Sequence, residues 1–222
     1  MNCMTQNYKQ IYVPALIDGN LVKIPEFWLC KDIEYKSDSN GMLFSAAEYL
    51  DYNPPTLAEL RHAYFDKNLD GSWISPDYRV SVLSKKSYGE WVSTFFQDGR
   101  RIIERPERVI YNEKHELWIA EGGRVTPVEP PPNGWVLEYD KTTDFPSKTS
   151  RKRKDAEQIF DDDSSYFYRS VKGLKAIFLA TDIGPFYIDA SHNPDHAHLF
   201  IGIRICHRSE QNKKFLATLI HS

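Results

Sequence analysis

Apolar and polar residues alternate at the start of the chain, over residues 11–30, on either side of Asp18-Gly19-Asn20. A period of two is typical of a strand that buries one face, and a short turn of Asp, Gly and Asn between two such runs indicates a hairpin. The pattern therefore predicts an opening β-hairpin.

Two short segments carry the strong helical signals. Residues 43–50 place apolar side chains at helical spacing, and Ser45 is followed three residues later by Glu48, as in a capping box. A proline pair ends this segment, and Thr56 then caps a second one over 56–64. We expect two consecutive short helices.

Beyond the helices the pattern changes to short strand-like runs separated by Gly, Pro, Asp and Asn, at 79–83, 90–96, 108–111, 116–120 and 135–139. Residues 147–165 hold a basic block followed by an acidic one, and such self-compensating charge predicts a solvated insertion loop. The tail 209–222 carries an apolar stripe that suits either a docking helix or a subunit contact. We expect one domain over residues 1–222.

Composition narrows the possible functions. Aromatic residues make up 14% of the chain, which suits a β-rich core and also a binding surface. The net charge of -3 argues against nucleic-acid binding through bulk electrostatics. Cys3, Cys30 and Cys206 lack a CxxC spacing, which fits a reducing compartment or a protein for which disulfides do not matter.

The start of the chain, MNCMTQNYKQ, is polar and lacks the apolar core of a signal peptide. No apolar run approaches the length that spans a membrane. We therefore expect no membrane span, and either a cytoplasmic location or association with a virion or cell surface by another route.

Four short motifs occur in order between the first helix and Cys206: FSAAEYL followed by PPTLAEL, GEWVST at 89–94, RSVKG at 169–173, and IGIRI at 201–205. Together they resemble the formylglycine-generating-enzyme branch of the C-type-lectin fold. The resemblance implies an α+β, C-type-lectin-like fold with two short helices packed on a twisted antiparallel sheet with long loops. The sequence departs from that family at Leu60, which replaces a tryptophan, and after Gly173, where a second glycine, a serine and a tryptophan are missing.

Residues of these motifs also have physical roles of their own. Trp91 is expected to fill the core, and Gly173 to belong to the piece that frames the final region. Gly202, between apolar neighbours, indicates a strand against which another backbone packs closely. Arg204 points away from the flanking isoleucines and is expected to pair with a carboxylate or with carbonyls at a sheet edge.

Enzymatic activity of that branch depends on two neighbouring cysteines in the final region that bind copper. Here only Cys206 lies in that region, so the second thiolate of the metal site is missing. The Glu-Pro-Asn and Trp-Asn-Asp motifs of calcium-dependent lectins are absent as well. We therefore expect a protein that is not an enzyme and has no cofactor.

The same branch contains the variable proteins of diversity-generating retroelements, in which adenine-specific mutagenesis rewrites the final region. Residues 178–200 contain no Lys, Glu, Gln, Met or Trp, and each can be reached from an asparagine codon by changing its adenines. The resemblance implies a loop-rich, variable segment that binds an unknown protein or surface ligand. The candidate ligand-binding residues are Phe178, Leu179, Thr181, Asp182, Phe186, Tyr187, Asp189, Ser191, His192, Asn193, Asp195, His196, His198 and Phe200.

The histidines of this segment allow two other interpretations. Together with Asp189, His192, His196 and His198 have spacings that suit zinc. The triplet His196-Ala197-His198 also resembles the metal-binding strand of single-strand nucleases and small transposases that link transiently to DNA through a tyrosine. In that family the nucleophilic tyrosine follows the histidines, but no tyrosine follows His198 here, so Tyr166 or Tyr168 would have to serve in a rearranged order. A metal-dependent single-strand DNA nuclease is the alternative function.

Overall fold

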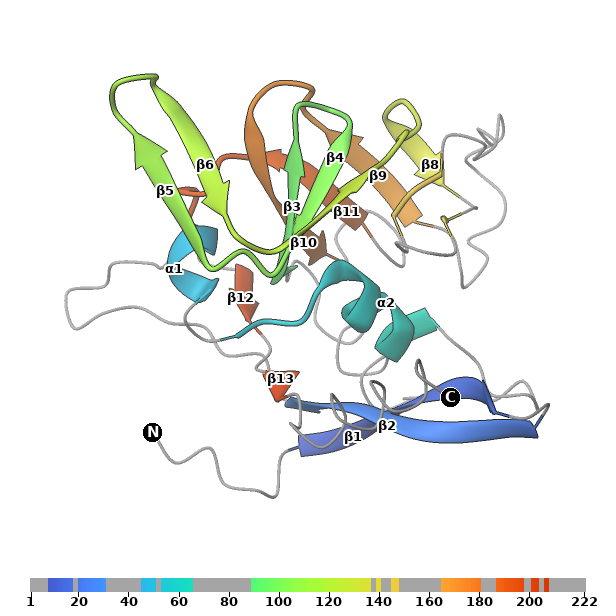
Figure 1. Ribbon diagram of the computed structural model, residues 1–222. Helices are drawn as coiled ribbons and strands as arrows, with labels where there is room; N and C mark the ends of the chain where they lie inside the picture. Colours follow the sequence, from blue (N-terminus) through green and yellow to red (C-terminus); the bar gives the residue numbers. More distant parts are fainter. Residues whose placement is uncertain are drawn as a thin grey trace.

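The structure is a computed structural model with a mixed α+β fold, mostly sheet, with two short helices (Figure 1). It describes residues 8–17, 20–30, 45–50, 53–65, 89–136, 139–140, 145–147, 165–180, 187–197, 201–203 and 206–207. The predicted strand at 79–83, nearly all of the charged loop at 147–165 and the tail at 209–222 lie outside these ranges.

The opening hairpin is confirmed. Strands β1 (Tyr8–Ile17) and β2 (Asn20–Cys30) pair antiparallel, with Ile17 opposite Asn20 at the turn. The short strand β13 (Cys206–His207) pairs with the other edge of β2. The beginning and the end of the described chain therefore meet in one three-stranded sheet.

Both predicted helices are present, as α1 (Ala46–Tyr49) and α2 (Leu57–Phe65). The backbone N–H of Ser45 donates to the Glu48 carboxylate at 2.6 Å. In α2 the box is complete, because the N–H of Thr56 donates to Glu59 Oε2 at 2.7 Å and the N–H of Glu59 donates to Thr56 Oγ1 at 3.2 Å. Each carboxylate thus satisfies a backbone donor that the helix geometry leaves free.

The main sheet has the strand order β7-β4-β3-β10-β11-β9-β8, with β12 paired to β3. The strands are β3 (Gly89–Gln97), β4 (Arg101–Glu104), β7 (Arg124–Pro127), β8 (Gly134–Val136), β9 (Ser165–Arg169), β10 (Leu174–Ala180), β11 (Tyr187–His192) and β12 (Ile201–Ile203). The prediction of an antiparallel sheet is wrong for two pairs, because β11 runs parallel to β9 and β12 runs parallel to β3. The β11–β9 pair is parallel because β11 enters between two strands that run in opposite directions.

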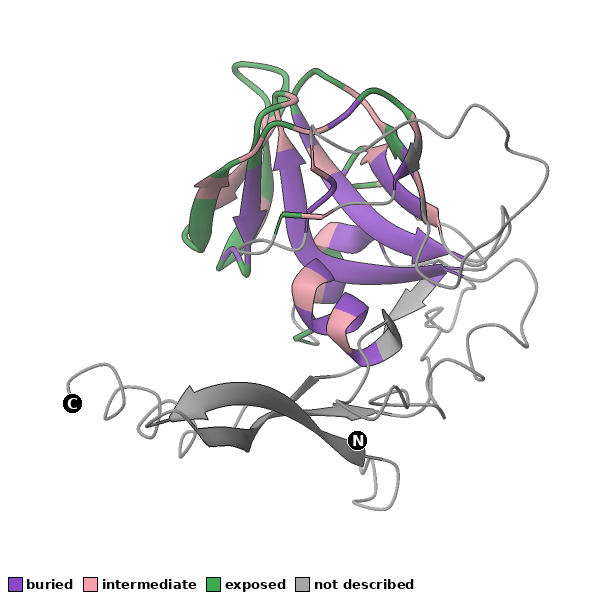
Figure 2. Cartoon of the chain, turned by 90° about the vertical axis from the view of Figure 1, so that its right-hand side faces the viewer, coloured by how far each residue is buried: buried purple, intermediate pink, exposed green. Residues whose placement is uncertain are grey.

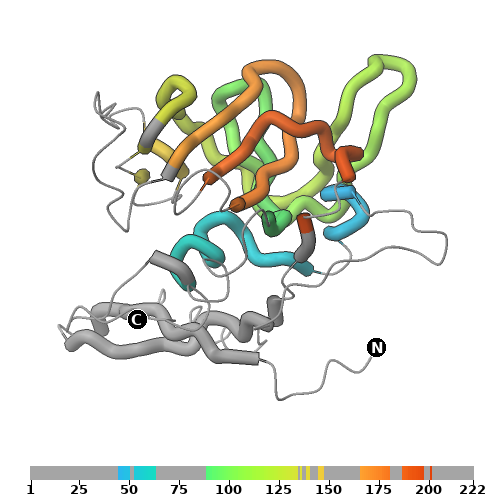
Figure 3. Tube along the Cα trace, turned by 180° about the vertical axis from the view of Figure 1, so that it is seen from behind, coloured from blue at the N-terminus to red at the C-terminus, as the bar shows by residue number. Residues whose placement is uncertain are grey.

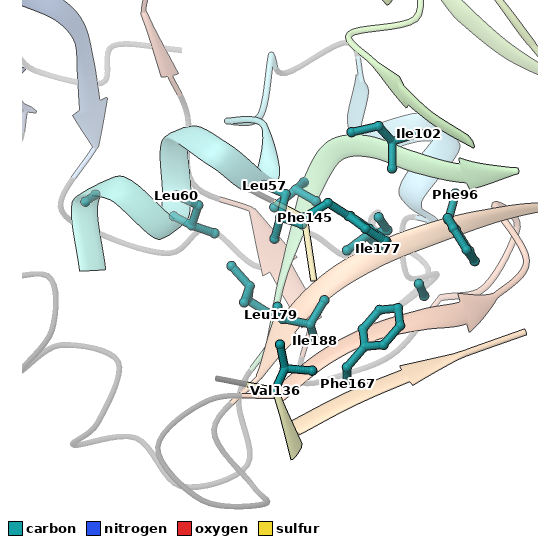
Figure 4. Close-up of a cluster of buried hydrophobic side chains, with 13 residues drawn as sticks. Leu57, Leu60, Phe96, Ile102, Val136, Phe145, Phe167, Ile177, Leu179 and Ile188 are labelled. Carbon is teal, nitrogen blue, oxygen red and sulfur yellow. The ribbon is translucent and has the colours of Figure 1, made fainter. Parts of the chain in front are cut away.

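Apolar side chains cover both faces of this sheet. On one face α2 packs over a core of Leu57, Leu60, Ala63, Val92, Phe96, Ile102, Val136, Phe145, Phe167, Ile177, Leu179, Ile188 and Ala190, and Figure 4 shows α2 lying against the sheet side chains. On the other face α1 and the hairpin β5 (Arg108–Asn112)–β6 (Leu117–Glu121) cover Trp91, Phe95 and Phe178. Trp91 is 1% exposed, so its predicted place in the core is confirmed. Figure 2 shows the buried residues running through the central strands.

The segment 178–200 contains regular strands, so its description as loop-rich is wrong for residues 178–180 and 187–192. Strand β10 is buried on both faces: Ile177 and Leu179 face α2, while Phe178 and Ala180 face the other side. A strand of this kind reads as a continuous apolar run instead of an alternation. The period-two pattern that reveals a half-buried strand is therefore missing there.

Candidate functional site

Strands β9 and β11 lie side by side in parallel register, with Tyr166 opposite Tyr187 and Tyr168 opposite Asp189. Side chains two residues apart on a strand project from the same face of the sheet. Phe167, between the two β9 tyrosines, is fully buried on the α2 side. The tyrosines and Asp189 therefore share the opposite face. We call this surface the aromatic face, formed by Tyr166, Tyr168, Tyr187, Asp189, Ser191, His192 and His196.

The carboxylate of Asp189 organises the aromatic face. It is 4% exposed, and its Oδ2 accepts a hydrogen bond from the Tyr187 hydroxyl at 2.9 Å. Its Oδ1 accepts from the backbone N–H of Ser191 at 2.8 Å and from the Ser191 hydroxyl at 2.6 Å. His192 Nε2 lies 3.6 Å from Oδ2. One buried group thus fixes the positions of three neighbouring side chains.

Burial acts to raise the pKa of Asp189, because it removes the charged form from water. The hydrogen bonds from His192 and Ser191, together with the charge of His192, outweigh burial and hold the pKa of this carboxyl below its usual range. Asp189 is therefore ionised at neutral pH and accepts hydrogen bonds through both oxygens.

Ring contacts extend the aromatic face across the sheet. The rings of His192 and His196 stack with centroids 4.1 Å apart and planes 18° apart. His192 also lies against Phe178 at 5.4 Å, and His196 meets Trp91 edge to face at 6.3 Å. Tyr166 and Tyr187 stack at 5.8 Å on the far side. Such geometries are favourable for aromatic pairs, so the rings reinforce one another's positions.

The turn that carries His196 is held in place from both sides. The N–H of His196 donates to the Asn193 carbonyl at 3.0 Å. The N–H of Ala47 in α1 donates to the Pro194 carbonyl at 3.0 Å, and Ala197 forms a bridge with Ser45. Figure 3 shows the C-terminal end of this segment beside α1. The first helix therefore anchors the turn.

The aromatic face is partly open to solvent. Tyr168 is 42% exposed and the His192 side chain is 33% exposed. Tyr166, Tyr187, Ser191 and His196 are half-buried. The surface offers hydroxyl, imidazole and ring surface on a rigid support, which is the chemistry that binding surfaces use.

The structure divides the candidate ligand-binding residues into groups. Tyr187, Asp189, Ser191, His192 and His196 come together on the aromatic face. Phe178 and Leu179 are 7% and 3% exposed and belong to the two core clusters, so they are core residues and present no surface to a ligand. Asn193 and Asp195 are exposed in the turn. Thr181, Asp182, Phe186, His198 and Phe200 lie outside the described residues.

The residues assigned structural roles also have definite places. Gly173 turns the chain with φ of +71°, and its N–H donates to Asp98 Oδ1 at 3.0 Å. Gly202 lies in β12 opposite Glu90, so the predicted strand is confirmed. Arg204 lies outside the described residues.

Tyr166 and Tyr168 were not among the predicted ligand contacts, although they are two of the three tyrosines of the aromatic face. The signal that marks them is the alternation in Ser-Tyr-Phe-Tyr-Arg, where an apolar Phe167 separates two amphipathic side chains. These tyrosines lie beside β11 because β9 pairs with β11, although β10 comes between the two strands along the chain. Local sequence does not reveal such a pairing.

The nuclease and zinc interpretations both need converging ligands. Among the residues that the structure describes, no group of three or more His, Cys, Asp or Glu side chains is placed to hold a metal. His192 and His196 are stacked in near-parallel planes, and their nitrogen lone pairs lie within those planes. His196 lies at a turn, and its proposed partner His198 is outside the described residues.

The Ser191 hydroxyl donates to the carboxylate of Asp189. The described helices include none with the length and apolar character needed to cross a bilayer.

Comparison of the chain with protein-family models, with curated proteins and with solved structures found no match. The function of the aromatic face is therefore inferred from its own geometry.

Proposed function

We propose that this chain is a non-enzymatic ligand-binding protein that displays a variable C-terminal surface on a C-type-lectin-like scaffold, as in the variable proteins of diversity-generating retroelements. The observation that carries the proposal is the aromatic face. There the buried Asp189 contacts Tyr187, Ser191 and His192. Strand β11 lies beside Tyr166 and Tyr168 of β9. Prior ordering of such side chains lowers the entropic cost of binding.

The arrangement of the motifs supports a shared framework. The strand Ile201–Ile203 pairs directly with β3, which contains the GEWVST motif, so Gly202 lies opposite Glu90. The PPTLAEL motif also contacts β3. The N–H of Ser93 donates to the Pro55 carbonyl at 2.8 Å, and the Ser93 hydroxyl donates to the Pro54 carbonyl at 2.9 Å. Three of the four motifs are therefore in contact.

Burial divides the segment into positions that tolerate change and positions that do not. Phe178, Leu179, Ile188 and Ala190 are buried in the core. Tyr187, Ser191, His192, Asn193 and His196 are half-buried or exposed. If the segment is rewritten by mutagenesis, variation is expected in the second set, because substitutions at buried positions cost far more stability.

The first test is genomic. We expect a near-copy of the DNA that encodes residues 178–200, differing at adenines and lying beside a reverse-transcriptase gene. The differences should fall in the codons of Tyr187, Ser191, His192, Asn193 and His196. Differences spread equally over the codons of the buried residues would contradict the proposal.

The second test is a library. Codons derived from asparagine would replace Tyr187, Ser191, His192, Asn193 and His196, and most clones should keep a Tm within a few degrees of the parent. Clones selected on one immobilised folded protein should lose binding when these positions are reverted.

A control library at buried positions tests the division itself. The same codons would replace Ile177, Phe178, Leu179, Ile188 and Ala190, and these clones should unfold. Similar Tm distributions for the two libraries would exclude a display surface at the aromatic face.

A further inference from the structure

A groove of about 730 Å³ lies between α1, the β5–β6 hairpin and the turn at 193–197. Figures 1 and 3 both show the hairpin standing over α1, with the end of the 187–197 segment beside them. The groove is separate from the aromatic face. The ring of His196 stacks on His192 in the aromatic face, whereas its neighbours Asp195 and Ala197 line the groove.

The groove follows a strand edge. Five consecutive residues, 107–111, line it, and consecutive residues share one surface only along the edge of a strand, because alternate side chains project to opposite faces. In the described part of the chain, β5 pairs with β6 alone. No described strand pairs with the other edge of β5, and an unpaired strand edge is the kind of site to which an extended peptide adds.

The hairpin presents aromatic and apolar surface to this groove. Tyr111 is 48% exposed and Ile110 is 39% exposed. The ring of Tyr111 lies 5.4 Å from that of Trp118, and both residues line the groove. Aromatic faces of this kind attract cationic groups through the ring quadrupole.

The charges around the groove are mostly negative. Glu48, Glu107 and Asp195 line it and are exposed. Among the described residues that line it, Arg108 is the one cation, and it pairs with the carboxylate of Glu121 on β6. These three carboxylates complement a positively charged ligand.

We propose that this groove binds an extended segment of a partner protein by adding it to the free edge of β5, with a Lys or Arg side chain seated between the Tyr111–Trp118 pair and the carboxylates. The strand edge supplies main-chain hydrogen bonds and the aromatic-acidic groove supplies the selectivity for a cation. This inference is independent of the proposed function, because it uses a different surface.

The probe is a fluorescein-labelled peptide of alternating Arg and Thr, added to the full chain and followed by fluorescence anisotropy. The matched peptide carries Gln in place of Arg. We expect the Arg peptide to bind at least about tenfold more tightly than the Gln peptide. Equal affinity for the two peptides would overturn the proposal.

Variants distinguish the groove from diffuse attraction to an acidic protein. Tyr111→Ala and Glu107→Gln alter exposed side chains, and each should weaken binding about fivefold or more. The controls are Tyr168→Ala, which removes a similarly exposed tyrosine from the aromatic face, and Glu129→Gln, which removes an exposed carboxylate outside the groove. Both controls should bind as the parent does, with all Tm values unchanged.

Other outcomes contradict the proposal. If Tyr111→Ala and Tyr168→Ala weakened binding of the Arg peptide equally, the peptide would not bind specifically in the groove. Self-association of the chain, lost on Tyr111→Ala, would show that a second copy occupies the groove. By contrast, a loss of library-selected binders on Tyr168→Ala with unchanged peptide binding would support the proposal, because that variant leaves the groove intact.

Discussion

The hydroxyl of Tyr187 donates a hydrogen bond to Asp189, at 2.9 Å along the same face of β11. Because Asp189 is almost fully buried and Tyr187 is half-buried, the contact joins the core to the solvent-accessible surface. The same carboxylate accepts two hydrogen bonds from Ser191. A binding surface whose polar groups are fixed from below loses less entropy when a ligand binds.

Replacing this carboxylate should destabilise the protein. Asp189→Ala removes the acceptor of the Tyr187 hydroxyl and the Ser191 N–H, and a hydrogen bond to a charged group contributes about 1.5–3 kcal/mol. Urea denaturation of the variant and the parent measures this difference. Equal free energies of unfolding would show that Asp189 does not organise the surface.

The contribution of Asp189 should also depend on pH. Its pKa in the folded protein lies below that of an unfolded Asp, about 3.9, so its charge favours folding above that pH. This stabilisation is lost as the pH falls through the lower, folded-state pKa. The stability difference between the parent and Asp189→Asn should therefore be present at about pH 5 and shrink as the pH falls below about 4. A stability difference that stays constant down to about pH 2, well below the usual Asp pKa of about 3.9, would contradict the lowered pKa of Asp189.

Phe178 and Tyr168 should respond in opposite ways to truncation. Phe178 is 7% exposed and packs edge to face on Trp91, so Phe178→Ala should lower the free energy of unfolding by about 3–5 kcal/mol. Tyr168 is 42% exposed, and Tyr168→Ala should change it by about 0.5 kcal/mol or less. Thermal melts of the two variants provide the comparison. A tolerant Phe178 would return it to the ligand-binding set.

Two glycines with similar backbone angles should differ in their tolerance of alanine. Gly123 has φ of +80°, and an added Cβ would lie 2.6 Å from the Glu104 carbonyl oxygen. Gly173 has φ of +71°, but a Cβ there meets nothing within 4 Å. Gly173→Ala should cost about 1 kcal/mol from the left-handed conformation, and Gly123→Ala clearly more, because backbone must also move. Equal costs, measured by urea denaturation, would show that the backbone around Gly123 can relax.

The cap of α2 should contribute measurably to stability. Thr56→Ala removes the hydroxyl that accepts the N–H of Glu59, at an expected cost of about 1 kcal/mol. Thr56→Ser keeps this acceptor and should retain most of the stability, as followed by the Tm. Equal losses in the two variants would assign the role of Thr56 to packing of its methyl group instead.

Elements defined by neighbouring residues could be predicted from the sequence. The hairpin ending at Ile17 and Asn20 and the helix capped by Thr56 depend on contacts between residues close along the chain. The strand over 90–96 was also predicted, because aromatic and β-branched residues dominate it. Strand β10 was not, since burial on both faces removes the alternation that identifies a strand.

The sequence alone therefore determined the local elements, the identity of the aromatic, histidine and acidic side chains, and the unusual content of residues 178–200. Only the tertiary structure decided which of these side chains share a surface. The pairing of β9 with β11 brings Tyr168 opposite Asp189, and the same strands bury Phe178 and Leu179. Strand pairing joins residues far apart along the chain, and burial depends on what covers each face, so neither can be read from neighbouring residues.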